Sequence, residues 1–424
     1  MNIIICGAGR VGFTIAKLLS EQNHSITVID QSSEDIQKIK DSLDVNAIVG
    51  KATYPSILEK ANGAEADMII AVTRNDEINM LICQIAYTTF NISKKIARIR
   101  SQNYLDPKFS KLYNKENLPI DVIISPELEI AKSLQRKLEA PGALDNIPFA
   151  DNKIRLLEIL IKNDCPIKNI KLNELTKKFP DLEANILGVI RKEKFIILKK
   201  NDVMEKDDKA YVIINSSQMA KTLIAFGHNE KISSKILIIG GGNIGFNLAK
   251  DIEIHHANIS TCIIENNNER AKFIADQLTN TLVLNGDGLD QSILDEANIR
   301  EANMLLALTN DDETNLIISA VAKKNNCDSL TLVNNSDYNK LKDLLGLSKV
   351  VDPRMITVSK ILKHIHKGKI ESAYTIGNNQ AEIIHAQALS SSSLINKTIE
   401  ESKLPRGIRL GLIKKENKII VPDK

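Results

Sequence analysis

The chain has 424 residues, of which 43% are apolar, and its 56 lysines and arginines against 53 aspartates and glutamates leave a formal net charge of +3. This near balance gives no electrostatic case for binding nucleic acid or an acidic membrane surface, and no apolar run approaches the ~20 residues of a membrane-spanning helix. Its five cysteines are scattered without a CxxC pair, and an apolar strand that begins at residue 2 leaves no room for a signal peptide, so we expect a soluble protein of the cytoplasm.

A glycine-rich turn follows the first apolar run, residues 3–6, and precedes a helix-like stretch at 11–19. The turn has the GxGxxG pattern of dinucleotide-binding loops and consists of Gly7, Ala8, Gly9, Arg10, Val11 and Gly12. In that pattern the glycines permit a tight turn, a close approach of backbone to a pyrophosphate, and close packing of helix on strand. We therefore predict a phosphate-binding loop; the alternative is a glycine turn that binds no ligand.

An acidic residue, Asp30, ends the second predicted strand. A carboxylate at this position can accept hydrogen bonds from ribose hydroxyl groups, and its charge disfavours a 2′-phosphate. The sequence therefore favours NAD over NADP as the ligand. A local role, in which Asp30 caps the turn before Ser32, is the alternative.

The first half alternates six strand-like segments with helix-like segments, which is typical of a doubly wound parallel sheet of the Rossmann type. The strands are expected at 2–6, 25–30, 45–50, 66–73, 95–100 and 120–125. Thr73 and Arg74 follow the fourth strand, at the mouth of the crevice where this fold binds its ligand. Thr73 or Asp76 is expected to cap the next helix.

Two arginines, Arg98 and Arg100, alternate near the end of the fifth strand, although a strand inside a parallel sheet is normally apolar. An arginine in that place is costly unless it is paired, and bidentate phosphate recognition is a common use of its guanidinium. We therefore predict that both arginines line the nucleotide cleft. The alternative is an ion pair with Asp76 or Glu77.

A helix-like pattern at 126–138 follows the sheet, and beyond it the sequence changes in character. Residues 152–215 show the pattern of short strands and turns, and strands are expected at 154–161, 187–190, 195–198 and 210–214. We interpret this region as a small α+β domain.

The second half repeats the first, which indicates a duplication. Its glycine loop consists of Gly240, Gly241, Gly242, Asn243, Ile244 and Gly245, and Glu265 takes the place of the first acidic residue. Residues 304–309 match 68–73 at an offset of 304 − 68 = 236, which puts Asn334 and Ser336 opposite the two arginines. The second cleft has therefore lost both cations, and a duplicate that keeps the fold without the ligand is the alternative. The strands of this half are expected at 235–240, 260–265, 281–286, 302–309, 329–334 and 349–352, before a helix at 353–365.

The expected organisation is two Rossmann domains, at 1–125 and 233–352, each followed by a small α+β domain, at 140–227 and 370–424.

The second small domain is expected to be incomplete. Residues 187–193 recur as 410–416, an offset of 410 − 187 = 223, and at this offset the chain ends before the counterpart of the strand 210–214. An unpaired strand edge invites pairing with another chain. We therefore expect the residues after about 390 to be mobile or to be completed by a neighbouring subunit.

No nucleophile–base pair, HExxH motif or metal-ligand spacing of histidines and cysteines appears in the sequence. We therefore predict no catalytic residue and no metal site. An NAD-dependent dehydrogenase is the alternative that the Rossmann pattern suggests, and a nucleotide sensor without a membrane partner is another.

The two glycine loops, the segments 71–73 and 76–79, and the arginine-bearing strand 96–100 together resemble the RCK (regulator of potassium conductance) family. Within it, the doubled arrangement is most similar to the regulatory subunits of Trk-type potassium uptake systems, and the likeness spans essentially the whole chain. The resemblance implies a subunit that binds NAD(H) and adenine nucleotides, ATP or ADP, and assembles into a homo-oligomeric ring of RCK domains. This ring would lie at the inner face of the cell membrane and gate a Trk-type potassium-translocating membrane subunit.

The resemblance also implies roles for single residues. Residues 7–11 would hold the phosphates and Asp30 the ribose, while Thr73, Arg74 and Arg98 would line the rest of the cleft. In the second half, residues 240–244 and Glu265 would repeat the first two roles.

Overall fold

The computed structural model divides by its contacts into two compact parts, residues 1–130 with 352–364, and residues 131–351 with 365–424. Each part is described by itself. The residues that the structure describes are 1–22, 24–179, 182–229, 233–335, 338, 341, 344–347, 349–362, 364, 370–376, 380–390, 392, 394–402, 404–405, 407–415, 418–420 and 422.

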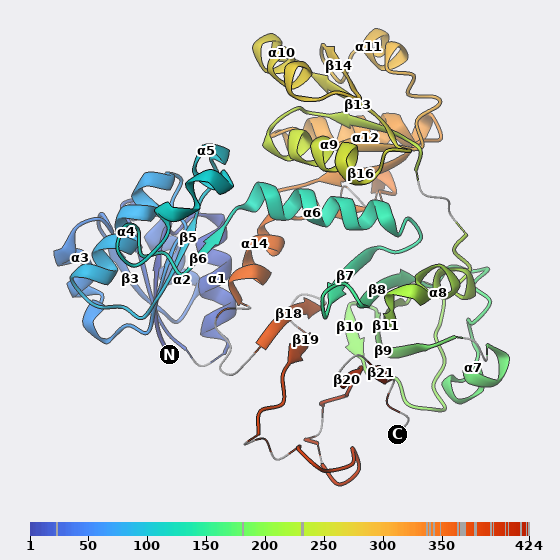
Figure 1. The fold of residues 1–424 in the computed structure, drawn as a ribbon, viewed down its shortest axis with the longest axis horizontal. Helices are drawn as coiled ribbons and strands as arrows, with labels where there is room; N and C mark the ends of the chain where they lie inside the picture. Colours follow the sequence, from blue (N-terminus) through green and yellow to red (C-terminus); the bar gives the residue numbers. More distant parts are fainter. Residues whose placement is uncertain are drawn as a thin grey trace. The chain divides into compact units, whose positions relative to one another are not determined.

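Six parallel strands form the first Rossmann sheet, in the order β3-β2-β1-β4-β5-β6 (Figure 1). The central strands are buried on both faces because helices cover both sides of the sheet. The doubly wound topology predicted from the sequence is confirmed. The strands are β1 (Asn2–Cys6), β2 (Ser25–Asp30), β3 (Asn46–Val49), β4 (Met68–Ala71), β5 (Lys94–Arg98) and β6 (Val122–Ile124); the helices are α1 (Arg10–Ser20), α2 (Ser33–Ser42), α3 (Pro55–Lys60), α4 (Asp76–Thr88), α5 (Gln102–Leu105) and α6 (Pro126–Glu139).

Helix α14 (Pro353–Leu362) comes from the second half of the sequence but packs in the first part of the molecule, against α1 and β6. Two lysines hold it there. Lys360 forms an ion pair with Glu129 (Nζ to Oε2, 2.8 Å), and Lys94 donates from Nζ to the carbonyl of His364 (2.6 Å). The sequence predicts this helix but not its partner, because an apolar stripe does not specify which surface it covers.

The second Rossmann sheet repeats the first, in the order β14-β13-β12-β15-β16-β17. Its strands are β12 (Lys235–Ile239), β13 (Ser260–Glu265), β14 (Thr281–Asn285), β15 (Met304–Ala307), β16 (Asp328–Leu332) and β17 (Val350–Val351); its helices are α9 (Asn243–His255), α10 (Asn268–Gln277), α11 (Gln291–Glu296) and α12 (Asp312–Lys324).

The fifth strands of the two sheets correct the alignment of the halves. Met68 of β4 pairs with Lys94, whereas Met304 of β15 pairs with Asp328, so the offset here is 328 − 94 = 234 rather than 236. The link from the preceding helix is two residues shorter in the second half, 325–327 against 89–93. Arg98 and Arg100 therefore correspond to Leu332 and Asn334, not to Asn334 and Ser336. The second cleft still lacks both cations.

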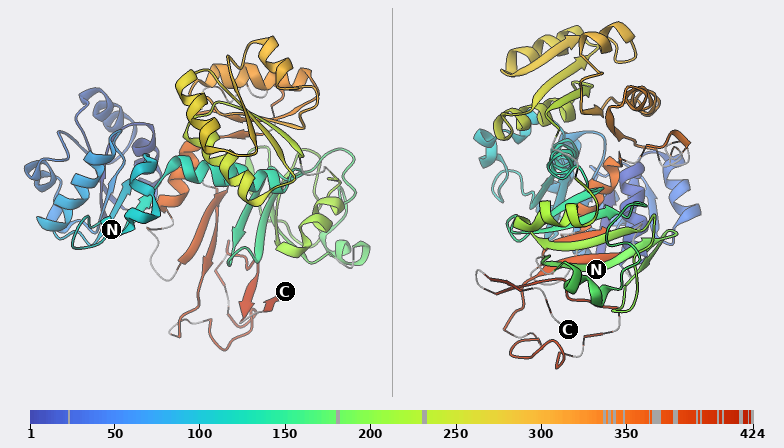
Figure 2. Two further views of the ribbon diagram at one scale, coloured as in Figure 1. Left: turned by 45° about the horizontal axis from the view of Figure 1, so that its top comes forward. Right: turned by 90° about the vertical axis from the view of Figure 1, so that its right-hand side faces the viewer.

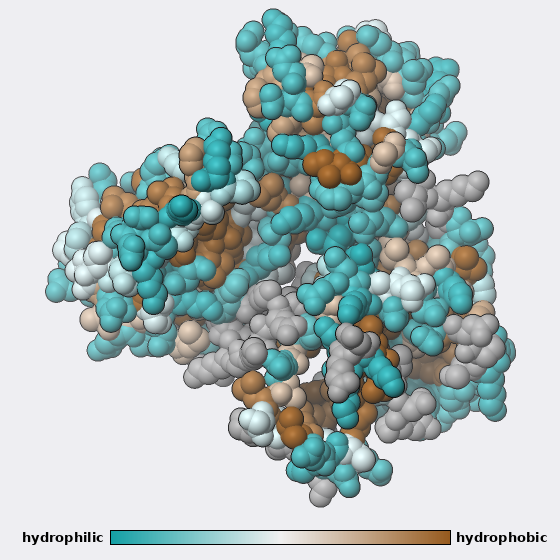
Figure 3. Space-filling view, viewed as in Figure 1, coloured by the Kyte–Doolittle hydropathy of each residue, from teal (hydrophilic) through white to brown (hydrophobic). Residues whose placement is uncertain are grey.

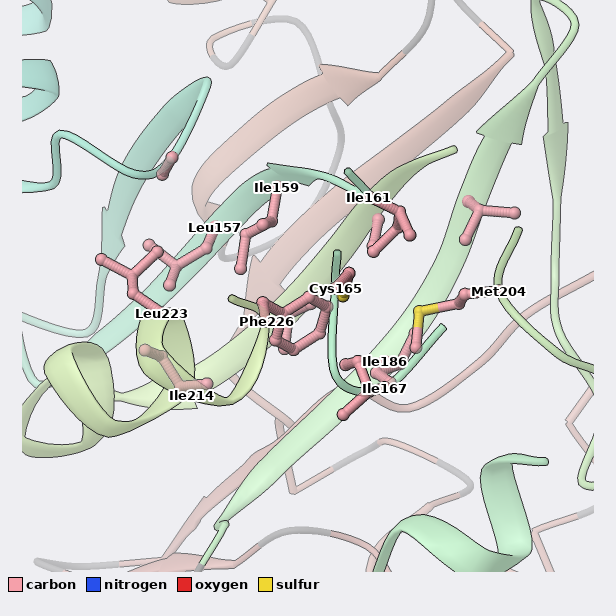
Figure 4. Packing of buried hydrophobic residues seen from close by; sticks show 14 of the residues in the cluster. Leu157, Ile159, Ile161, Cys165, Ile167, Ile186, Met204, Ile214, Leu223 and Phe226 are labelled. Carbon is pink, nitrogen blue, oxygen red and sulfur yellow. The ribbon is translucent and has the colours of Figure 1, made fainter. Parts of the chain in front are cut away.

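Residues 145–215 form a five-stranded antiparallel sheet in the order β10-β9-β11-β8-β7 (Figure 2). One face packs on a core that includes Leu157, Ile159 and Ile214 of the sheet and Phe226 beyond α8 (Figure 4). The sequence does not predict β7, whose apolar residues are interrupted by a proline. The elements are β7 (Asp145–Phe149), β8 (Ile154–Leu160), α7 (Leu172–Lys178), β9 (Ala184–Arg191), β10 (Lys194–Ile196), β11 (Lys209–Asn215) and α8 (Met219–Ala225).

The other face of this sheet is covered by the C-terminal region of the same chain (Figures 1 and 2). Two hairpins, β18 (Ile370–Ile376) with β19 (Ala381–Ala386) and β20 (Ile413–Lys415) with β21 (Lys418–Ile420), supply apolar side chains to one cluster with Leu156 and Ile213. The amide Nδ2 of Asn185 also donates to the carbonyl of Gly411 (2.8 Å).

This packing bears on the expectation that the region after about residue 390 is mobile or completed by another subunit, which stays a prediction. The described residues of 407–420 lie against the sheet of their own chain because its second face is apolar and needs a cover. Within the recurrent segment 410–416, strand β20 begins only at Ile413.

Among the described residues, no helix combines the length and the apolar character that crossing a bilayer requires. Polar and charged residues cover most of the face shown in Figure 3, and the apolar residues on that face lie in scattered groups. This distribution is ordinary for the surface of a folded protein in water.

A row of ionisable side chains lies beneath β18. Asp145, Glu158 and Tyr211 are direct neighbours across β7, β8 and β11, and the hydroxyl of Tyr374 donates to Asp145 Oδ2 (3.0 Å). Burial and the nearby charge of Asp145 raise the pKa of Glu158, and the lysines at 137 and 209 offset this rise only in part. Burial also raises the pKa values of both tyrosines, so their hydroxyl groups stay protonated.

We expect the packing of β18 on this sheet to weaken as the pH rises. Burial raises the pKa of Glu158 above its ordinary value of about 4.5, so Glu158 keeps a proton while β18 covers it and releases that proton when β18 detaches and water reaches the carboxyl group. Stability from this group is therefore full at acid pH and is lost upward from about pH 4.5. Hydrogen exchange in β18 and β19, corrected for its intrinsic rate, should be faster at about pH 8 than at about pH 5.

Glu158→Gln should remove this pH difference, because an amide cannot ionise. Glu183→Gln, at an exposed position of the same region, serves as the matched control and should leave the difference unchanged. A corrected exchange rate that is independent of pH in the unmodified chain would contradict the prediction.

Candidate functional site

The first glycine loop begins where β1 ends. Each of its three glycines is suited to its position for a different structural reason. Gly7 has φ +114°, a conformation that strains a residue with a side chain. A Cβ on Gly12 would overlap the carbonyl oxygen of Gly7, so no side chain fits there. Gly9 is the N-cap of α1 with φ −62°, and a Cβ on it would meet nothing within 4 Å. The N–H groups of the first turn of α1 are therefore accessible to an anion at Gly9.

Asp30 joins this loop to the turn after β2. Its Oδ2 accepts a hydrogen bond from the N–H of Ala8 (2.7 Å), and its Oδ1 accepts from the N–H of Ser32 (2.9 Å). The cap of α2 is Ser32, whose Oγ accepts from the N–H of Asp35 (3.1 Å). Each oxygen of Asp30 keeps a further lone pair, so the carboxylate can also accept from ribose hydroxyls beside Ala8.

A buried amide, Asn79, ties the end of β4 to the end of β5. Its Oδ1 accepts from the N–H (2.9 Å) and the hydroxyl (2.7 Å) of Thr73, and its Nδ2 donates to the carbonyl of Arg98 (2.8 Å). This tie fixes the residues that flank the loop, since a Cβ on Gly7 would lie 3.1 Å from the N–H nitrogen of Thr73. The sequence shows Asn79 as a repeated residue but does not indicate this role.

The cap of α4 differs from the prediction. Asn75 caps this helix by accepting from the N–H of Ile78 (2.8 Å), whereas Thr73 or Asp76 was expected to do so. Asp76 lies inside the helix and accepts from the N–H of Arg100 (2.9 Å) through Oδ2. It therefore fixes the chain after β5 rather than the start of its own helix.

Arg98 lies beside the loop and has an unsatisfied donor. Its Nη2 donates to the carbonyl of Thr73 (2.7 Å), while its Nε is buried without a hydrogen-bond partner. Burial, followed by the neighbouring Arg100, lowers the pKa of Arg98, which means that its surroundings disfavour the positive charge. No ion pair between Arg98 and a carboxylate forms among the described residues. A buried guanidinium in this condition is stabilised by an incoming anion.

Arg100 and Arg74 are placed differently. The Nε of Arg100 forms an ion pair with Glu127 of α6 (Oε1, 2.8 Å). The alternative expected from the sequence was an ion pair with Asp76 or Glu77, so an ion pair does form, but with a different carboxylate. Arg74 is exposed on the loop after β4. The structure thus gathers the glycine loop, Asp30, Thr73 and Arg98 at the carboxyl ends of the strands, while Arg100 is held by its own counter-ion.

The second loop has the same backbone constraints. Gly240 has φ +104°, a Cβ on Gly245 would overlap the carbonyl of Gly240, and the space around Gly242 is open. Glu265 repeats the bridging role of Asp30: Oε2 accepts from the N–H of Gly241 (2.8 Å), and Oε1 accepts from the N–H of Asn267 (2.9 Å).

The buried tie is repeated as well. Asn315 accepts from the N–H of Thr309 (2.9 Å) and donates to the carbonyl of Leu332 (3.0 Å). Asn243 begins α9 at an exposed position, and Ile244 follows it. The second cleft therefore keeps three features of the first: the glycine loop, the acid that bridges it to the next turn, and the buried asparagine.

One side chain has no counterpart in the first cleft. Arg270 of α10 donates from Nε to the carbonyl of Gly241 (2.9 Å), and its guanidinium packs against the neighbouring rings of Phe246 and Phe273, 5.4 and 5.0 Å from their centroids. At the same offset as the two acids, 265 − 30 = 235, the first half has Asp35 in this place. The sequence alone does not indicate a role for Arg270, although it shows the exchange of an acid for a base at this position.

A cavity of about 580 Å³ opens in the connection between β5 and β6, apart from the predicted site residues. Tyr104, which lines it, is tied to α4 by a hydrogen bond from its hydroxyl to Glu77 (2.9 Å). Tyr338 and Glu313 repeat this bond in the second half. The cavity is lined by Asn103, Tyr104, Lys108, Phe109, Lys111, Leu112 and Asn117.

The groups usual in catalysis are not assembled in the described part of the chain. Burial raises the pKa values of all five cysteine thiols, that of Cys83 to about 12, which keeps them protonated. Among the described residues, no three side chains of the metal-ligating types come together. The first cleft brings together the start of α1 at Gly9, Asp30 and Arg98, an arrangement that suits an anion with a ribose beside it.

Family models and relatives agree with this arrangement. The TrkA-N domain model matches residues 3–126 and 236–353, and the TrkA-C domain model matches residues 156–227. The Trk system potassium uptake protein TrkA of Azorhizobium caulinodans is 38% identical over 423 residues, which cover 100% of this chain and 92% of the relative. The protein of the same name from Haemophilus influenzae is 33% identical over 425 residues, covering 99% and 92%.

Solved structures share the fold at low sequence identity. The GsuK RCK domain is similar with a TM-score of 0.63 and 16% identity, covering 88% of this chain and 79% of that one. The GsuK channel bound to NAD gives a TM-score of 0.61 at 16% identity, covering 85% and 63%.

We expect Gly12→Ala and Gly9→Ala to separate the two tasks of the first loop. The methyl group at position 12 would overlap the carbonyl of Gly7, so this variant should lose roughly 1–3 kcal/mol of unfolding free energy. The methyl group at position 9 meets open space and should change stability by less than about 0.5 kcal/mol while obstructing a phosphate. Urea unfolding and nucleotide titration of both variants test this. Equal stability losses would contradict the assignment.

Proposed function

Because this chain belongs to the TrkA family of potassium uptake proteins, we propose that it is the nucleotide-binding regulatory subunit of a Trk-type potassium uptake system. In this proposal it binds NAD(H) or an adenine nucleotide, ATP or ADP, and thereby gates a potassium-translocating membrane subunit. It acts by binding rather than by catalysis. The names of the full-length relatives support the physiological context, and the geometry of the first cleft supports the ligand.

The observation that carries the proposal is the condition of Arg98. Its side chain is half-buried beside the glycine loop, its buried Nε has no acceptor, and burial together with the neighbouring Arg100 lowers its pKa. A polyphosphate bound at the first turn of α1 would supply the missing acceptor. Arg98 would then contribute a charge-assisted hydrogen bond to the ligand.

The remaining residues of the first cleft fit the two ends of such a ligand. The N–H groups of α1 at Gly9 would hold the pyrophosphate, and Asp30 would hold the ribose, with Thr73 and Arg74 along the opposite wall. GsuK, whose fold is similar, has been solved bound to NAD and to ADP. We propose that these residues and their counterparts at 240–245 and 265 form the cofactor sites of this chain.

The packing of α1 suggests how binding reaches the rest of the chain. The N-terminus of α1 would hold the phosphates, and the same helix packs against α14, which leads from the second Rossmann sheet to the C-terminal hairpins. Suppose that α1 can adopt two positions and that the ligand binds more tightly to one of them. Ligand binding would then favour that position of α1 and would move α14, which packs against it. In a ring of such chains beneath the membrane, the shift would bias the pore.

Arg98→Met and Arg100→Met should have opposite effects on stability and affinity. Arg98→Met removes a half-buried cation that forms no ion pair among the described residues, so the ligand-free protein should be as stable as the parent or more stable. Nucleotide affinity should fall roughly 10- to 100-fold through loss of one charge-assisted hydrogen bond. Thermal unfolding and calorimetric titration with NADH and ATP measure the two quantities.

Arg100→Met is the matched control. It leaves Glu127, whose side chain is only 9% exposed, without its counter-ion. This variant should lose roughly 1–3 kcal/mol of stability and keep more of its nucleotide affinity than Arg98→Met. A large stability loss in Arg98→Met with unchanged affinity would show that Arg98 is structural.

The regulatory role itself is tested with the membrane partner. Potassium flux into vesicles that contain a Trk-type membrane subunit should depend on this chain and change when NADH or ATP is added. The Arg98→Met chain should still associate with the vesicles but lose the response. Turnover of NADH by the chain alone across a panel of small carbonyl substrates would favour a dehydrogenase instead, and flux that is indifferent to nucleotide would refute gating.

A further inference from the structure

The two clefts differ most in charge where the ribose of the ligand would lie. Across residues 30–38 the first half carries three acids and one lysine, a net charge of 1 − 3 = −2. The corresponding residues 265–273 carry two acids, one lysine and one arginine, a net charge of 2 − 2 = 0. In the first cleft Lys38 is occupied by Glu34 (3.0 Å), so no cation there is directed at the loop.

In the second cleft Arg270 is fixed against the loop itself. Its Nε is bound to the carbonyl of Gly241, and the guanidinium packs against two adjacent phenyl rings, Phe246 and Phe273. A Cβ on Gly241 would overlap the side chain of Ile274, so the glycine at this position is what allows α10 to come so close. The first loop has Ala8 instead, with Asp35 in the place of Arg270.

The terminal amino groups of Arg270 remain available. Only Nε takes part in a hydrogen bond recorded among the described residues, and no carboxylate lies within ion-pair distance of the guanidinium. Both oxygens of the nearby Glu265 accept backbone N–H groups, as those of Asp30 do, so the two acids are alike and Arg270 is what distinguishes the second cleft. In Rossmann sites, an acid at the end of the second strand selects an unmodified ribose, whereas an arginine close to it accommodates a 2′-phosphate.

We propose that the second cleft accepts a dinucleotide with a phosphate on the 2′-hydroxyl of its adenosine ribose, that is NADP(H), and that Arg270 binds this phosphate. This inference rests on the proposed nucleotide-binding function. The first cleft, with Asp30 and Asp35 at the same place, selects NAD(H). One chain would then respond to two nucleotide pools, to NAD(H) through the first cleft and to NADP(H) through the second. The aromatic rings serve to hold the guanidinium in position, so that little side-chain freedom is lost when the phosphate arrives.

The test is calorimetric titration of the full chain with NAD⁺ and with NADP⁺. The unmodified chain should bind both, and each should still bind when the other is present at saturation. Arg270→Glu should weaken NADP⁺ binding roughly 10- to 100-fold and leave NAD⁺ binding at the first cleft unchanged. Arg300→Glu makes the same charge change at an exposed position of the same half and should alter neither affinity.

A reciprocal variant keeps the test decisive if Arg270→Glu fails to fold. Asp35→Arg alters only the first cleft and should raise its affinity for NADP⁺ relative to NAD⁺. NADP⁺ binding that survives Arg270→Glu, or NADP⁺ that does not bind while NAD⁺ does, would overturn the inference and leave the proposed function intact. A chain that binds neither dinucleotide would overturn both.

Discussion

The close approach of the third glycine of each loop to the carbonyl of the first determines where each nucleotide cleft forms. A side chain on Gly12 or on Gly245 would collide with the preceding turn, so only hydrogen lets the helix start against the end of the strand. From that contact follow the direction of α1, the exposed backbone at Gly9 and the position of the acid that bridges loop and turn. The same direction brings the far side of α1 against α14. One contact between backbone atoms thus connects the binding loop with the packing of a distant helix.

Much of the fold and of the frame of the site follows from the sequence, because apolar runs and glycine spacing report directly on buried strands and tight turns. The strand order and the loop–acid pairs are of this kind. The register of β16 does not follow, since a link shortened by two residues leaves no mark in a gapless comparison of the halves. Nor do the partners of α14 and of the C-terminal hairpins, because an apolar face is complementary to any other apolar face. The contrast between Arg98 and Arg100 depends on the distance to Glu127, which no local pattern encodes.

The halves have diverged in charge while their frame has stayed the same, and the hydrogen bonds explain why this is possible. Asn79 and Asn315 reach the next strand through the carbonyls of Arg98 and Leu332, and Asp76 and Asp312 accept from backbone N–H groups just after it, so these bonds do not depend on which side chains stand there. Arg98 could therefore become Leu332, and Asp35 could become Arg270, without disturbing the strand ends. Because these buried amides and carboxylates bond to backbone groups, the side chains around them can be replaced without loss of the fold. Such replacements can then change which ligand the cleft prefers.

The place of α14 has a consequence for the ancestry of the chain. A helix encoded after the second Rossmann sheet covers a surface of the first part of the molecule, so the first half alone would leave α1 and β6 uncovered. An ancestor with one copy of the repeat would have met the same need by borrowing the helix of a second molecule, as domain-swapped dimers do. Fusion of two such genes would then have converted an exchange between molecules into a connection within one. From that point the two copies were present in equal numbers, and each was free to specialise without losing its partner.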